Sequence, residues 1–153
     1  MIPIAHHESL EESSLFQPNF SGFDRTSRVD EFDEADRQKL TKMIMRLFEH
    51  WKLTTADQLE ILGLSANSRR MLSQYRKGKA LPNNRDMLDR IGWLLVMHQN
   101  LRTLYPGNPE LCYSWINRRS RHLGNLTPLE VMKDQGFIGI FRVAQLLEHL
   151  VEL

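Results

Sequence analysis

TTADQLEILGLSANSRRMLSQYRKGK, residues 54–79, is the stretch that decides the fold. A short helix is expected at its start, because Thr54, or the threonine after it, can cap the first turn with its hydroxyl. Gly63 stops this helix, and a second helix runs from Ser65 to about Gly78. Two helices joined by a glycine turn are the parts of a helix-turn-helix. The stretch therefore predicts a helical protein that contains this motif.

The second of these helices has an apolar side and a basic side. Met71, Leu72 and Tyr75 are expected to face the core. Arginine can bond guanine with two N–H groups, glutamine suits adenine, and lysine can hold phosphate. The predicted DNA-binding residues are therefore Arg69, Arg70, Ser73, Gln74, Arg76, Lys77 and Lys79. The alternative is a helical hairpin whose charges are only solvated.

Longer helices flank this motif. Asp33 to Trp51 carries apolar residues at spacings of three and four, which predicts an amphipathic helix. Asn84 to Leu104 carries two apolar stripes, so it is expected to be buried on both sides. Its second stripe, from Ile91 onward, either joins two parts of the chain or forms a dimer contact. No segment alternates as a strand does, so the predicted class is all-α.

A small helical module is predicted after the break at 105–109. Three helices are expected there, at 109–118, 127–136 and 137–153, and Asn108 caps the first of them. In the second helix Thr127 is the cap, Pro128 takes the first position and Glu130 completes a capping box. Gly136 ends that helix. Threonine, proline and glutamate in this order are a strong helix start. The loop between the first two helices is basic.

Charge is divided unevenly along the chain, although the net charge is only +1. Residues 1–36 hold nine acidic and two basic side chains, and residues 37–153 hold ten acidic and eighteen basic ones. A basic domain behind an acidic segment favours a polyanion as partner. The predicted organisation is an acidic, mostly disordered arm at 1–31, a helix-turn-helix domain at 32–105 and a C-terminal domain at 106–153.

Composition and motifs exclude several other classes. Apolar residues make up 41% and charged residues 25%, which is typical of a globular protein. The longest apolar run, 93–97, is far shorter than the roughly 18 residues of a membrane span. Residues 1–10 lack a secretory signal and Cys112 is the single cysteine, so a cytoplasmic location is expected. The histidines lack ligand spacing and no phosphate loop occurs; we expect no enzyme activity, metal or cofactor.

The C-terminal part resembles a known family. Its motif residues are Tyr113-Ser114-Trp115-Ile116-Asn117, then Leu123-Gly124-Asn125-Leu126-Thr127-Pro128-Leu129-Glu130-Val131-Met132, then Gly136. This order is similar to the toxin-binding domain of the Xre/MbcA/ParS antitoxins, in which an Xre-like helix-turn-helix comes first. The resemblance covers about residues 33–150. Arg118-Arg119-Ser120 stands where the family has Pro-Asn, and Asn125 stands where it has a second glycine.

The resemblance implies a type II antitoxin. Its partner would be a RES-domain toxin that consumes or transfers ADP-ribose from NAD, and the end of the antitoxin would obstruct the NAD pocket. Carried over to this chain, the toxin-binding residues are Leu147, Glu148, Leu150, Val151, Glu152 and Leu153. Structural roles in the motif fall to Trp115, Gly124, Thr127, Pro128 and Glu130. The helix-turn-helix would bind operator DNA as a homodimer and repress the operon.

Two alternative functions are consistent with the same residues. The chain could be a stand-alone repressor whose C-terminal helices serve dimerisation or ligand binding. It could also be an interaction module whose helix-turn-helix does not bind DNA.

Overall fold

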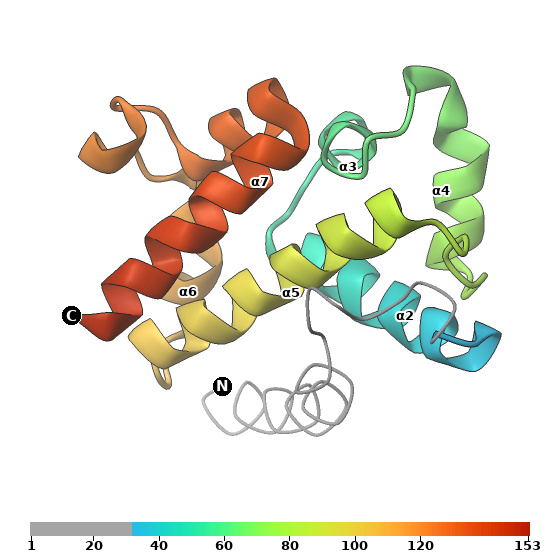
Figure 1. Cartoon of the computed structure of the whole chain (residues 1–153), viewed down its shortest axis with the longest axis horizontal. Coiled ribbons are helices and arrows are strands. Elements are labelled where there is room, and N and C mark those ends of the chain that lie inside the picture. Colours follow the sequence, from blue (N-terminus) through green and yellow to red (C-terminus); the bar gives the residue numbers. More distant parts are fainter. Residues whose placement is uncertain (1–31) are drawn as a thin grey trace.

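The computed structural model describes residues 32–153, which fold into helices joined by short loops (Figure 1). The α-helices are α2 (Glu34–His50), α3 (Thr55–Ile61), α4 (Arg69–Arg76), α5 (Arg85–Leu104), α6 (Pro109–Ser114) and α7 (Pro128–Glu152). Three 3₁₀ turns are η2 (Ala66–Ser68), η3 (Trp115–Asn117) and η4 (Arg121–Leu123). Within these residues the only β pairing is an isolated bridge, so the all-α prediction is confirmed. The predicted acidic arm, residues 1–31, lies outside the described residues.

Side-chain caps set the helix starts where the sequence predicts them. Asp33 forms a reciprocal capping box with Asp36. Single bonds from a backbone N–H to a capping oxygen begin the later helices, at Thr54 (3.1 Å), Asn84 (3.1 Å), Asn108 (3.2 Å) and Thr127 (3.1 Å). Each cap satisfies a backbone donor that has no partner inside its own helix. The order of helices therefore follows from local sequence signals.

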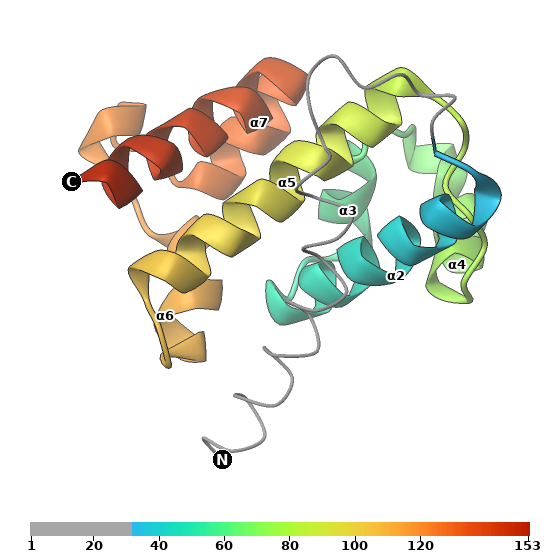
Figure 2. The same cartoon turned by 60° about the horizontal axis from the view of Figure 1, so that its bottom comes forward.

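Helix α5 is the centre of the fold. It lies between α2 on one side and α7 on the other (Figures 1 and 2), and α6 packs against it as well. Both of its apolar stripes pack against other helices. In the second stripe, Trp93 lies edge-on to Phe141 of α7, with 5.1 Å between the ring centroids. The second stripe thus joins two parts of the same chain. Trp93 and Val96 of this stripe stay half-buried, so the alternative, a dimer contact through Ile91–Leu104, stays a prediction.

The hydrophobic core is continuous from α2 to α7. It includes Trp51 and Trp115, both buried. The predicted boundary at 105 and 106 falls in a loop, and core residues from both sides of it pack in one cluster. No helix among residues 32–153 is both long enough and apolar enough to cross a membrane.

Three details differ from the sequence prediction. The helix expected from Ser65 begins with the 3₁₀ turn η2, and the helix expected at 109–118 already gives way to η3 after Ser114. Met71 was expected in the core, but its side chain is 40% exposed. The buried line of α4 runs through Leu72 and Tyr75. Because successive residues turn by about 100°, Met71 falls at the edge of that line.

Two glycines shape α7. Gly136 has φ 60° and ψ −140°, so the helix breaks there, at the position where the sequence predicts an end. The break lets the second segment turn against the first. As a result, a Cβ added at Gly139 would overlap the carbonyl oxygen of Val131 and would lie 2.9 Å from the Cβ of Gln135. Gly139 is therefore the point of closest approach between the two segments.

Candidate functional site

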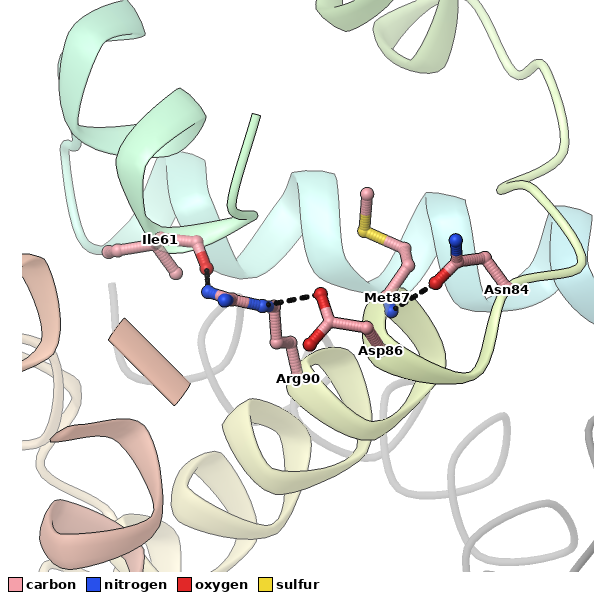
Figure 3. A network of polar contacts seen from close by, with 5 residues as sticks. All are labelled: Ile61, Asn84, Asp86, Met87 and Arg90. Atoms are coloured by element: carbon pink, nitrogen blue, oxygen red, sulfur yellow. Dashed lines mark hydrogen bonds and ion pairs between the residues drawn. The ribbon is translucent and has the colours of Figure 1, made fainter. Parts of the chain in front are cut away.

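The α3–α4 unit, residues 55–76, is held on the long helices by specific bonds. Arg90 of α5 donates from Nη1 to the carbonyl oxygen of Ile61 at 3.0 Å and from Nε to Asp86 at 2.9 Å (Figure 3). The guanidinium thus satisfies a carbonyl at the end of α3, where a cation is favoured. Gly63 has φ +72°, and a Cβ there would lie 2.8 Å from Cζ of Arg90. The positive φ therefore favours glycine in the turn after α3, and a Cβ there would require the Arg90 side chain to shift.

The loop after α4 is tied to α2. Thr41 accepts the backbone N–H of Leu81 at 3.0 Å, and Arg37 donates from Nε to the carbonyl of Leu81 at 3.0 Å. Arg37 also bonds the carbonyl of Phe32 at 2.7 Å. Both ends of α4 are thereby fixed relative to the core, so its outward face is a rigid surface.

The basic face of α4 consists of the seven predicted DNA-binding residues. Five of them are exposed and two, Ser73 and Gln74, are half-buried. No acidic residue occurs between 61 and 85. The structure therefore places these seven side chains on or near one exposed surface of positive charge.

Three of the seven side chains, Gln74, Arg76 and Lys79, already form hydrogen bonds within the protein. Arg76 donates from Nη2 to Thr55 Oγ1 at 3.2 Å and to Gln58 Oε1 at 3.3 Å, so it links α4 to α3. Gln58 is itself fixed by a bond from Nε2 to the carbonyl of Leu53 at 3.0 Å. Lys79 donates from Nζ to Gln74 Oε1 at 3.2 Å. The sequence could not show these bonds, because they depend on how the helices cross.

A second basic surface lies in the loop between η3 and α7. Arg118 donates to the carbonyl of Leu111 at 3.2 Å and lies over the ring of Tyr105, 5.4 Å from its centroid. Arg119 donates to the carbonyl of Asn125 at 3.0 Å. Asn125 and Gly124 both have positive φ, 65° and 66°. Asn125, which stands where the family pattern has a second glycine, thus keeps the left-handed backbone conformation, which asparagine tolerates.

The six predicted toxin-binding residues do not share one environment. Leu147 is 0% exposed, and its spacing from Ile140, Val143 and Ala144 places it on the inner stripe of α7. Leu150 and Val151 are half-buried, Glu148 and Glu152 are exposed, and Leu153 is 88% exposed. Leu147 is accordingly corrected to a core residue. The other five lie on or near the surface at the C-terminal end.

One exposed apolar side chain on α7 was not among the predicted site residues. Ile138, just after the break at Gly136, is 66% exposed. The high apolar content of the last helix hinted at an uncovered side chain, but only the packing against α5 shows which one it is.

The residues predicted as structural are found in structural positions. Trp115 and Pro128 are buried, and Thr127 caps α7. Gly124 adopts the left-handed conformation that ends η4. Glu130 lies in the first turn of α7, where its backbone N–H bonds Thr127, but the reciprocal side-chain bond of the predicted capping box is not formed.

The C-terminal part also contacts the α3–α4 unit directly. Helix α3 packs against α7, and Lys133 donates to Asp57 at 2.8 Å. This hydrogen bond raises the pKa of Lys133 above its ordinary value of 10.5. The rings of His50 and Tyr113 stack at 4.4 Å, which joins α2 to α6. Among residues 32–153, no three histidine, cysteine or acidic side chains are grouped so that they could hold a metal.

Comparison with known proteins bears on the C-terminal part. Residues 100–150 match the family model described as the antitoxin Xre/MbcA/ParS C-terminal toxin-binding domain. The chain is also similar to a protein of Sinorhizobium fredii (strain NBRC 101917 / NGR234) named "Uncharacterized protein y4oB". The two are 28% identical over 103 residues, which cover 67% of this chain and 77% of that protein. The family match suggests an antitoxin role and a toxin as partner.

Proposed function

We propose that this protein is a cytoplasmic type II antitoxin without enzyme activity. It neutralises a RES-domain toxin by occluding the NAD pocket, and it represses its own operon through the basic face of α4. The observation that carries the proposal is the match of residues 100–150 to the antitoxin toxin-binding domain. That segment includes α7 as far as Leu150 and ends three residues before the exposed Leu153.

The positions of the basic face of α4 and of the C-terminal end of α7 support a role in both DNA binding and toxin binding. The basic face of α4 and the C-terminal end of α7 lie at opposite ends of the molecule (Figures 1 and 2). A toxin at one end would leave the other end open for DNA. At the toxin end, Leu150, Val151 and Leu153 supply apolar contact, and Glu148 and Glu152 supply negative charge for cationic groups near an NAD pocket.

The antitoxin role is tested by co-expression with the product of the neighbouring gene, with growth as the readout. The full chain should restore growth, and a variant that ends at Leu150 should not, because it lacks the exposed end. Truncation before Phe137 would be uninformative, since it removes Ile140, Val143 and Leu147 from the core. Circular dichroism of the short variant serves as the folding control. A harmless neighbour would refute the proposal and favour the stand-alone repressor.

Operator binding is tested by charge reversal on α4. The double variant Arg70→Glu and Lys77→Glu is expected to bind upstream DNA about 100-fold more weakly, because each lost base or phosphate contact is worth roughly 1–3 kcal/mol. The salt dependence of binding should become shallower as well. Gel shifts at several salt concentrations measure both effects.

A matched control carries the same change in charge elsewhere. Arg121→Glu and Arg142→Glu alter two exposed arginines of the C-terminal part. Their DNA affinity should fall far less than that of the α4 variant. Equal losses for the two variants would mean that α4 is not the DNA-binding helix. Two copies are expected on paired half-sites.

A further inference from the structure

An apolar side chain stands exposed on the most basic helix of the protein. Met71 is 40% exposed. Gln74 follows three residues after Met71 and four residues after Arg70, so it neighbours both side chains on the surface of α4. A partner that suits this group must offer both negative charge and a small apolar surface. In the major groove, phosphates supply the charge and the C5-methyl group of thymine supplies the apolar contact.

Gln74 keeps its capacity to read a base. Lys79 Nζ donates to the amide oxygen of Gln74 at 3.2 Å. That oxygen has a second lone pair, and the amide nitrogen has two N–H donors. Gln74 can therefore still offer adenine the one acceptor and one donor by which glutamine reads it.

We infer that Met71 is a base-reading residue that packs on a thymine methyl group, next to base edges read by Arg70 and Gln74. The inference rests on the proposed operator binding and adds the chemistry of the preferred site.

The test begins with selection of binding sites by the full-length chain from a random double-stranded DNA library. Each thymine of the selected site is then replaced by deoxyuridine, which lacks only the methyl group. One thymine per half-site should weaken binding about four-fold on replacement, the effect of about 0.8 kcal/mol for one buried methyl group. With Met71→Ala, the same replacement should have no effect.

Leu111→Ala is the matched control for Met71→Ala. Leu111 is 38% exposed and lies on α6, away from α4, so this variant should retain the deoxyuridine effect. Binding without any deoxyuridine-sensitive thymine would overturn the inference and leave the proposed operator binding intact. So would a deoxyuridine effect that persists in Met71→Ala. If the chain binds no DNA even at low salt, the proposed operator binding itself fails.

Discussion

Replacing Gly139 with alanine is expected to lower the free energy of unfolding by about 3 kcal/mol. Alanine would ordinarily stabilise a helix by about 1 kcal/mol relative to glycine. Here the added Cβ overlaps the carbonyl oxygen of Val131 and lies 3.0 Å from its carbonyl carbon. Both atoms belong to backbone that is fixed in the core, so they cannot move aside as a flexible side chain would. The clash therefore outweighs the gain in helix propensity.

Denaturant unfolding of the full chain, followed by circular dichroism, measures this effect. Gly136→Ala provides a comparison, because no atom lies within 4 Å of a Cβ at that position. Its cost comes only from φ 60° and ψ −140°, a conformation close to glycine-only, and should be about 1–3 kcal/mol. A Gly139→Ala protein as stable as the wild type would show that the two segments of α7 do not pack as closely as the structure has them.

The sequence predicts the helices well because their starts depend on local chemistry. Asp33, Thr54 and Asn84 each cap a helix through a bond to a residue three positions later. The need for glycine at Gly139 is different in kind. It arises from a contact with Val131, eight residues earlier, which exists only because the chain turns at Gly136. No periodicity in the sequence carries that information.

The candidate functional sites likewise contain features that the sequence predicts and features that it does not. The basic face of α4 could be predicted, because helical spacing alone brings its residues to one side. Met71 could not be placed correctly, since a helix of eight residues has too few positions to define its inner line. The bond from Lys79 to Gln74 depends on the path of the chain after Gly78, where φ is +104°. This bond therefore could not be predicted from the sequence.

Leu147→Ala is expected to lower the free energy of unfolding by about 2–5 kcal/mol. Leu147 is fully buried on the stripe of α7 that packs against α5. Truncation removes apolar burial and leaves a cavity that the surrounding helices fill only in part. For a domain of this size the melting temperature should fall by about 10 °C. Thermal unfolding followed by circular dichroism measures the change.

Leu153→Ala is the natural partner experiment, because the resemblance assigns both leucines to the same toxin-binding surface. Leu153 is 88% exposed, so its replacement should leave the melting temperature unchanged while it weakens the complex with the toxin. Leu147→Ala should still neutralise the toxin at a temperature where it remains folded, since the buried side chain touches no partner. A folded Leu147→Ala protein that fails to bind would mean that α7 opens to bury this residue against the toxin. Separating stability from binding at these two positions thus shows which part of the last helix holds the fold and which part meets the partner.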